Sequence, residues 1–241
     1  MTCRDKVAIV TGAAGKGMGR SIALTLAREG AKVAVNYRTS ADSARAVVEH
    51  IQDRGGEAAA VHADVFTDEG CSKLVEAAVK AFGGADICII GPGGGWHTEP
   101  VDQLDARAAL QDVHDELAPL YLLMPLVLPG MVERGWGRIV ALSLAAPYDS
   151  PAYAYNVGKA ARTHAMLLGS RQTGKKGVTL NVIGPGPVDA IETLEEAVEV
   201  CDHGPAWQRR KATSPQDIAE GVAFLCSEAG RFITGCELPY R

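Results

Sequence analysis

The chain has 241 residues, of which 47% are hydrophobic and 22% charged, and its formal net charge is −5 at pH 7. This is ordinary globular composition, so it excludes a disordered chain and a fibrous repeat. A negative net charge does not supply the basic face that binding to the phosphates of a nucleic acid requires, which argues against a nucleic-acid partner. Domains usually have about 100 to 200 residues, so this length allows one large domain or two small ones, and we expect a single domain over residues 1–241.

Short β-branched runs and amphipathic stretches alternate along the chain. The apolar runs lack the alternation of half-exposed strands and predict strands buried on both faces, at 7–10, 33–35, 58–62, 87–90, 138–142 and 178–183. Apolar residues at spacings of three and four predict helices at 19–29, 41–54, 68–82, 104–133 and 155–172. Repeated βαβ units predict a Rossmann-like α/β fold, a doubly wound, mainly parallel sheet of about seven strands whose ligand crevice lies outside their carboxyl ends.

The longest apolar stretch, residues 117–132, is interrupted by Pro119, Pro125 and Pro129. It is shorter than the roughly 20 residues that span a bilayer, so we interpret it as a buried helix and expect no membrane partner. Residues 1–10 lack the long apolar region of a signal peptide, and the six cysteines show no CxxC spacing. We therefore expect free thiols and a cytoplasmic location. No cluster of His, Cys, Asp and Glu has metal-ligand spacing, so we expect no metal site.

A glycine-rich loop follows the first predicted strand and precedes the first predicted helix. Its backbone can approach a pyrophosphate at the helix N-terminus, and its candidate cofactor-binding residues are Thr11, Gly12, Lys16, Gly17, Met18 and Gly19. An NAD-binding site places Asp or Glu about 20 residues further on, but the second strand here ends in Asn36, Tyr37 and Arg38. The Arg38 guanidinium can bind a 2′-phosphate through two parallel hydrogen bonds, and Lys16 can add a second positive charge. The sequence therefore favours NADP(H) over NAD(H).

Tyr155 and Lys159 form a Tyr-x-x-x-Lys motif near the start of a predicted helix. The four-residue spacing places both side chains on one face of the helix, near the crevice. A free phenol has a pKa of about 10, and an ammonium group about 5 Å away lowers that pKa by roughly two units at an effective dielectric constant of about 20. The pair therefore indicates a general acid/base with a cation that tunes it.

Together, the glycine loop and the Tyr-x-x-x-Lys motif resemble the short-chain dehydrogenase/reductase family. The resemblance covers nearly the whole chain and includes the segments 64–65, 135–140, 181–186 and 232–235. It implies hydride transfer between NADP(H) and a carbonyl or alcohol carbon of a small molecule, with Tyr155 as general acid/base. It also implies that Lys159 holds the nicotinamide ribose and lowers the pKa of Tyr155. Further cofactor contacts implied by the resemblance are Asp64, Val65, Gly93, Pro185, Gly186 and Val188.

The chain departs from the family pattern at the catalytic serine. Counting back from Tyr155 places the family's Ser column at Leu142, whereas alignment from residues 137–138 places it at Leu144. Ser143 lies between these positions and is our candidate for the catalytic Ser. Residues of the following loop offer substitutes, namely Tyr148, Asp149 and Ser150. Loss of one oxyanion-type donor typically slows a reaction by about 10²–10³ without abolishing it.

Three further positions differ from the family. The glycine loop is one residue longer, the usual Asn-Asn-Ala-Gly after the fourth strand is replaced by residues 90–93, and the family's helix Asn falls near His114 or Glu116. These departures leave a second hypothesis open. In that hypothesis the fold and nucleotide site persist without redox turnover, in a cofactor-binding structural partner or a non-redox lyase.

Three side chains are candidate substrate contacts: Trp96 and His97 after the fourth strand, and Tyr148 after the fifth. Trp96 and His97 are alternatively loop residues that meet solvent or a neighbouring subunit. The segment 189–213 occupies the position of the family's mobile substrate lid. The resemblance also implies that the long apolar helix 104–132 forms a helix-to-helix interface, in a homotetramer or homodimer.

Overall fold

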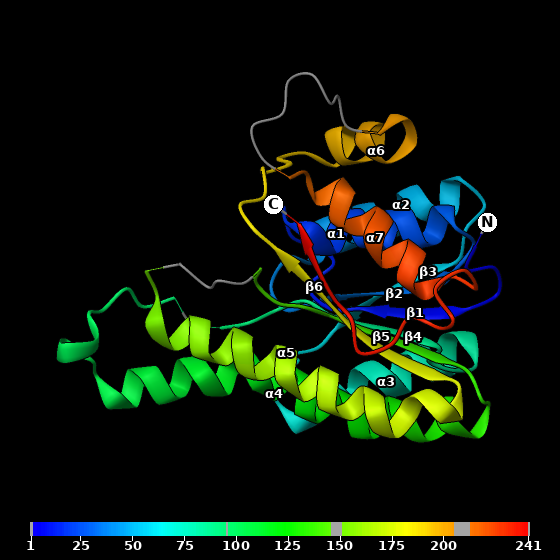
Figure 1. The fold of residues 1–241 in the computed structure, drawn as a ribbon. Helices are drawn as coiled ribbons and strands as arrows, with labels where there is room; N and C mark the ends of the chain where they lie inside the picture. Colours follow the sequence, from blue (N-terminus) through cyan, green and yellow to red (C-terminus); the bar gives the residue numbers. More distant parts are fainter. Residues whose placement is uncertain (1, 95, 146–150, 205–212, 241) are drawn as a thin grey trace.

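Seven parallel strands form one sheet at the centre of the molecule (Figure 1). The computed structural model describes residues 2–94, 96–145, 151–204 and 213–240. The strand order is β3-β2-β1-β4-β5-β6-β7, so the direction of winding reverses between β1 and β4. The strands are β1 (Val7–Val10), β2 (Lys32–Tyr37), β3 (Ala58–His62), β4 (Ile87–Ile90), β5 (Gly137–Leu142), β6 (Val178–Pro185) and β7 (Glu237–Tyr240). This confirms the predicted doubly wound fold, whose ligand crevice opens at such a reversal.

Helices cover both faces of the sheet (Figure 1). One face carries α1 (Met18–Arg28), α2 (Ala41–Asp53) and α7 (Pro215–Cys226), with α6 (Leu194–His203) lying outside them. The other face carries α3 (Asp68–Phe82), α4 (Ala106–Glu133) and α5 (Tyr153–Thr173). Two short 3₁₀ helices, η1 (Val101–Gln103) and η2 (Gly174–Lys176), precede α4 and follow α5.

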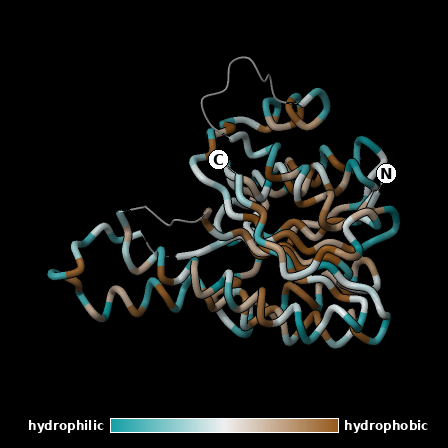
Figure 2. Tube along the Cα trace, viewed as in Figure 1, coloured by the Kyte–Doolittle hydropathy of each residue, from teal (hydrophilic) through white to brown (hydrophobic). Residues whose placement is uncertain are grey.

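The strands are apolar throughout because each of their faces is buried in a separate core. In β4, Ile87 and Ile89 pack into the core beneath α1 and α7, while Cys88 and Ile90 pack into the core beneath α4 and α5. Figure 2 shows this as hydrophobic colour concentrated along the strands. Two-sided burial is the reason that the strands lack polar alternation.

The C-terminal part of the sheet was missed by the sequence analysis, which located six of the seven strands. The seventh strand, β7, is short and contains Pro239, which an edge strand tolerates because one side of its backbone needs no partner. Helix α7 carries a signal that could have been used: Ser214 and Asp217 form a capping box, with Pro215 in the first turn.

Helix α4 contains Pro119, Pro125 and Pro129 and still runs for 28 residues. By length and composition alone, α4 could cross a membrane, with a mean hydropathy of 1.3, and it is the single helix of this kind among the described residues. Its buried side nevertheless packs into the core through Leu120 and Leu123. Only 39% of its apolar window is buried, so α4 is buried on one side and exposed on the other, whereas the sequence predicted a buried helix.

Candidate active site

A cavity of about 240 Å³ lies where the loops after β1, β2, β3 and β4 meet. Five of the residues predicted to bind the cofactor line it: Gly12, Arg38, Asp64, Val65 and Gly93. The other lining residues were not singled out by the sequence analysis: Ala14, Gly15, Asn36, Tyr37, Thr39, Ser40, Ala63, Phe66 and Pro92. The structure thus brings the glycine loop, Arg38 and Asp64 into one site. Lys16 is not among the lining residues.

Two glycines of the loop, Gly12 and Gly19, cannot be replaced freely. Gly12 has a φ of +62°, in the region that favours glycine. A Cβ atom on Gly19 would lie 2.4 Å from the carbonyl oxygen of Gly12. Gly17 caps the start of α1, which begins at Met18, so the first backbone N–H groups of the helix follow the loop directly. This backbone cradle fits a pyrophosphate group.

Two buried polar residues hold the loop in place. Asn36 accepts a hydrogen bond from the N–H of Gly12 at 3.1 Å and donates one to the carbonyl oxygen of Ala63 at 2.9 Å. The Thr11 hydroxyl donates to the carbonyl oxygen of Ile89 at 2.8 Å and accepts from the N–H of Gly91 at 2.9 Å. Asn36 was not proposed as a site residue, although its position in an otherwise apolar strand is a signal. Thr11 acts on the site by joining the loops after β1 and β4.

The two cations proposed for a 2′-phosphate lie in different surroundings. The Arg38 side chain is 60% exposed, and its Nη1 lies 4.0 Å from Asp64 Oδ1. An exposed pair at that distance binds weakly, so the guanidinium is free to bind a ligand. Lys16, by contrast, forms an ion pair with Glu192 of the segment before α6, with 2.5 Å between Nζ and Oε2. Arg38 therefore supports a phosphate contact directly, whereas Lys16 would have to leave Glu192.

Tyr155 and Lys159 lie in the first turns of α5, as the four-residue spacing predicted. The Lys159 Nζ lies 5.1 Å from the centroid of the Tyr155 ring. It lies closer to a carboxylate, 3.0 Å from Glu116 Oε2 of α4, and Arg162 Nη2 lies 3.3 Å from the same oxygen. All three charged side chains are buried. Glu116 is one of the two residues on which the family's helix Asn was expected to fall.

The pKa values at this pair differ from the expectation that Lys159 lowers the pKa of Tyr155. Burial and the nearby Glu116 carboxylate raise the pKa of Tyr155 to about 12, with Arg162 acting in the opposite sense. Burial and the neighbouring Arg162 cation lower the pKa of Lys159 to about 8, against the influence of Glu116. Burial is the largest cause of the upward shift at Tyr155 and the Glu116 carboxylate the second, and neither was counted in the expectation. That Lys159 lowers the pKa of Tyr155 stays a prediction.

Arg162 was missed by the sequence analysis and is fully buried at the centre of the site. Its Nε donates to the carbonyl oxygen of Glu116 at 2.7 Å, and its Nη2 donates to that of Pro92 at 2.7 Å. Its Nη1 donates to the carbonyl oxygens of Leu142 at 2.9 Å and Gly91 at 3.3 Å. One guanidinium therefore joins α4, the end of β5 and the loop after β4 to α5. Its position one turn after Lys159, on the same helix face, was the available signal.

The Ser143 hydroxyl is buried against α5. It donates its hydrogen to the carbonyl oxygen of Lys159 at 2.9 Å and accepts a hydrogen bond from the Thr163 hydroxyl at 2.7 Å. A hydroxyl has one hydrogen to donate, and here a backbone carbonyl takes it. A catalytic role for Ser143 stays a prediction, and this geometry favours a structural role that ties β5 to α5. Tyr148, with Asp149 and Ser150, lies outside the described residues.

The loop after β4 places Trp96 against the predicted acid/base. The Trp96 and Tyr155 rings meet edge to face, with centroids 5.0 Å apart, and Trp96 is 56% exposed. The next residue, His97, contacts buried Asp112 of α4, with Nδ1 2.8 Å from Oδ2. This hydrogen bond and the Asp112 charge raise the pKa of His97. Asp112 was not foreseen, because its partner lies in a loop 15 positions away.

The remaining predicted cofactor contacts lie at the end of β6, where Pro185 is the last residue of the strand and Gly186 and Val188 follow it. The N–H of Gly186 donates to the carbonyl oxygen of Tyr240 at 2.7 Å, which joins the residues after Pro185 to β7. Val188 forms an isolated bridge with Thr213, at the two ends of the expected lid. Residues 205–212 of the lid lie outside the described part of the chain.

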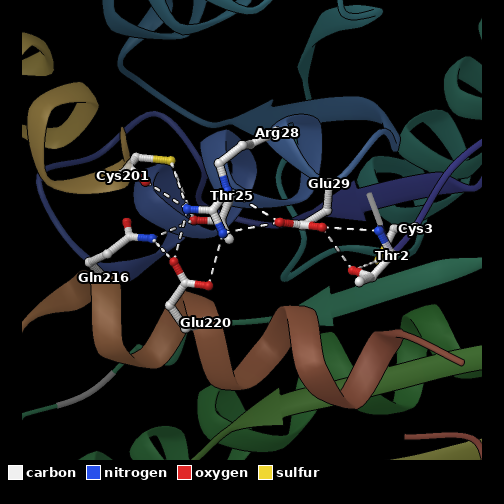
Figure 3. Close-up of polar contacts among 8 residues, drawn as sticks. All are labelled: Thr2, Cys3, Thr25, Arg28, Glu29, Cys201, Gln216 and Glu220. Atoms are coloured by element: carbon white, nitrogen blue, oxygen red, sulfur yellow. Dashed lines mark hydrogen bonds and ion pairs between the residues drawn. The ribbon is translucent and has the colours of Figure 1, made fainter. Parts of the chain in front are cut away.

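The first half of the segment expected to form the lid packs against the body of the protein. Arg20 of α1 donates to the carbonyl oxygen of Ile191 at 2.6 Å. Figure 3 shows Arg28 of α1 between α6 and α7: its Nη1 donates to the carbonyl oxygen of Cys201 at 2.6 Å, and Nη1 and Nη2 each bind the Glu220 carboxylate at 2.9 Å. Helix α6 is therefore held against α1 at both of its ends.

A glycine loop, a cation after β2, and a phenol beside a lysine at the crevice define a nicotinamide-dependent oxidoreductase of the doubly wound class. Residues 12–240 match the family model described as Enoyl-(Acyl carrier protein) reductase. The chain belongs to the short-chain dehydrogenase/reductase family.

Relatives of known activity agree with this assignment. The chain is 34% identical to the 7alpha-hydroxysteroid dehydrogenase of Escherichia coli K12 over 239 residues, covering 95% of this chain and 90% of the relative. It is 33% identical to a 3-oxoacyl-(acyl-carrier-protein) reductase of Staphylococcus epidermidis over 241 residues, covering 96% and 95%. These relatives are oxidoreductases, so the hypothesis of a non-redox protein is not favoured.

Two solved structures are similar over almost the full chain. A 7alpha-hydroxysteroid dehydrogenase in complex with NADH and 7-oxo glycochenodeoxycholic acid gives a TM-score of 0.85 at 28% identity, covering 99% of this chain and 93% of that one. A blue fluorescent protein from a metagenomic library, in complex with NADPH, gives a TM-score of 0.83 at 26% identity, covering 99% and 97%. The cofactor is therefore a nicotinamide dinucleotide.

Proposed function

We propose that the protein is an NADP(H)-dependent carbonyl reductase or alcohol dehydrogenase in which Tyr155 is the general acid/base. The observation that carries this proposal is the place of Gly93. Gly93 lines the cofactor cavity, and a Cβ atom on it would lie 1.8 Å from Glu116 Oε1, beside Lys159. The nucleotide cavity and the Tyr155 cluster are therefore adjacent parts of one site.

The residues of the chain have separate tasks in this reaction. A bound nicotinamide supplies or accepts the hydride at the carbon of the substrate. In the reducing direction, the O–H bond of Tyr155 breaks and its proton goes to the carbonyl oxygen; in the oxidising direction the phenolate takes that proton back. Lys159 holds the ribose beside Tyr155. Trp96 forms an aromatic wall next to the phenol, and His97 and Tyr148 are further candidate substrate contacts.

Preference for NADP(H) over NAD(H) is supported by Arg38. It follows β2, lines the cavity, and has a single weak ion-pair partner among the described residues, in Asp64. A guanidinium binds a phosphate as a fork, and no carboxylate stands at the end of β2 to bind ribose hydroxyls.

A homotetramer or homodimer is supported by the outer surfaces of α4 and α5. Large apolar side chains on these helices are exposed, among them Leu110 at 71%, Tyr121 at 61% and Leu168 at 55%. Exposed apolar residues on paired helices favour burial against a second copy. A cytoplasmic location is supported by the six cysteines, which are free, with five of them buried.

The test is consumption of NADPH with a panel of ketones. We expect turnover by the wild-type protein and loss of at least about 10²-fold in kcat for Tyr155→Phe, because general acid catalysis contributes about 10²–10⁴. Tyr153→Phe, two residues earlier on α5, is the matched control and should retain turnover. NADPH binding without oxidation across the panel would contradict the proposal.

A further inference from the structure

The loop after β4 lies directly against α4 because it begins with glycines. Residues 93–95 are all glycine. A Cβ atom on Gly93 would lie 1.8 Å from Glu116 Oε1. One on Gly94 would lie 2.4 Å from Asp115 Cβ. Glycine also loses more conformational freedom on folding than any other residue, so such a stretch needs a contact further along to fix its course.

A single hydrogen-bonded pair provides that contact. His97 Nδ1 lies 2.8 Å from Asp112 Oδ2 and 2.9 Å from Oδ1. Asp112 is 2% exposed, and His97 is its one side-chain partner among the described residues. A buried carboxylate without a partner is costly, which favours the closed pair. At the described positions between residues 92 and 99, the loop makes no other hydrogen bond.

Trp96 stands directly before this pair and faces the other way, toward α5. Its ring meets the Tyr155 ring edge to face, with centroids 5.0 Å apart, and 56% of the residue is exposed. One edge-to-face contact is modest and would not by itself fix an indole that follows three glycines. Attachment of His97 to α4 fixes the backbone from which the Trp96 side chain extends.

We propose that His97 and Asp112 are positioning residues that hold Trp96 beside Tyr155, so that the site selects carbonyl substrates with an apolar ring next to the reacting carbon. The proposal rests on the proposed function for the roles of Tyr155 and Trp96. It goes further, because it gives His97 a task that acts through Trp96 and it names a class of substrate.

The substrate class follows from where the indole lies. A carbonyl oxygen that takes a proton from Tyr155 lies within hydrogen-bond reach of the phenol oxygen. The groups attached to the carbonyl carbon then lie next to Trp96, whose exposed side is a flat apolar surface. Rings pack favourably on such a surface, and a methyl group covers little of it.

The first test is fluorine NMR of protein labelled with fluorotryptophan. The chain has three tryptophans, and the Trp96 resonance is the one that disappears in Trp96→Phe. In wild type it should lie away from the position of a solvated fluorotryptophan, because the Tyr155 ring contacts the indole. It should move toward the solvated position in His97→Ala and in Asp112→Ala. The double variant should move it no further, since both substitutions remove the same contact.

Two controls separate this effect from a general loss of structure. His114→Ala is the matched variant, because His114 also pairs with an aspartate of α4, with Nδ1 3.0 Å from Asp115 Oδ1, and lies outside the loop. It should leave the Trp96 resonance in place. The Trp136 resonance should stay unchanged in every variant, which shows that the fold is intact.

The outcomes are decisive even if one variant fails to fold. His97→Ala leaves a buried carboxylate without its partner, whereas Asp112→Ala removes the carboxylate together with the pair. An unchanged Trp96 resonance in folded Asp112→Ala would overturn the proposal. A Trp96 resonance at the solvated position in wild type, or additive shifts in the double variant, would overturn it as well.

The second measurement uses KM in Asp112→Ala. For ketones with a ring beside the carbonyl, such as acetophenone, KM should rise by about 2- to 10-fold, the size of one aromatic contact, while kcat changes less. For short acyclic ketones, such as acetone, KM should stay within about twofold. An equal rise for both kinds of ketone would count against the proposal. Absence of NADPH oxidation with any ketone by wild type would instead contradict the proposed function, and the fluorine shifts would still report on Trp96.

Discussion

Replacement of Arg38 by Ala is the sharpest test of cofactor preference. The Arg38 side chain is 60% exposed and lines the cavity, with its guanidinium 4.0 Å from Asp64 and 5.4 Å from the centre of the Phe66 ring. Little is therefore lost within the protein when the side chain is removed. A fork to a 2′-phosphate adds charge-assisted hydrogen bonds, which contribute about 1.5–3 kcal/mol, at the lower end when exposed and screened by salt. Since about 1.4 kcal/mol is tenfold in affinity, the Kd for NADPH should rise by about 10- to 100-fold.

The assay is titration calorimetry, with NADPH and NADH measured on wild type and Arg38→Ala. The Kd for NADH should change by less than about threefold, because NADH lacks the 2′-phosphate that the Arg38 guanidinium is expected to bind. Arg45→Ala is the control, since Arg45 is an exposed arginine of α2 outside the cavity. Equal affinity of wild type for the two cofactors would refute the reasoning, and so would a parallel loss of both in Arg38→Ala.

Three further results are expected. Asp112 raises the pKa of His97, so the imidazole should stay charged above pH 6.5, near the usual histidine pKa of about 6.5, and lose its charge as the pH rises through the raised pKa. In Asp112→Asn, an NMR titration of His97 should move back toward the usual histidine pKa. Arg162→Met should lower the free energy of unfolding by about 3–5 kcal/mol in urea, because it leaves the buried Glu116 carboxylate with one fewer cation, and an unchanged midpoint would contradict the described contacts. Tyr121→Glu should shift light scattering toward monomer, whereas a wild-type monomer at micromolar concentration would contradict an oligomer through α4.

The sequence predicted the elements that depend on local pattern. The strands at 7–10, 58–62 and 87–90 have the same bounds in the structure, because runs of apolar residues between glycines and polar turns are local signals. The cofactor loop and the Tyr-x-x-x-Lys pair are local as well. Helix α6 and strand β7 were not located, since one is strongly charged and the other is a four-residue edge strand with a proline.

The charged centre of the site could not be derived in the same way. Glu116 and Arg162 are 46 positions apart, and their contact depends on how α4 packs against α5. A sequence shows a Glu and an Arg on two helices, and each is ordinarily a solvated residue. The sign of the pKa shift at Tyr155 follows from that packing, so a pairwise argument from Lys159 alone could not reach it.

The contacts between the segment before α6 and the start of α1 have a mechanical consequence for the glycine loop. Lys16 forms an ion pair with Glu192. Arg20 is a buried residue just after the loop, and it donates a hydrogen bond to the carbonyl oxygen of Ile191. The segment that enters α6 is thus fastened to the segment that enters α1. A ligand that displaces one segment would therefore act on the other, so the segment at the position of the expected substrate lid is tethered directly to the loop predicted to bind the dinucleotide.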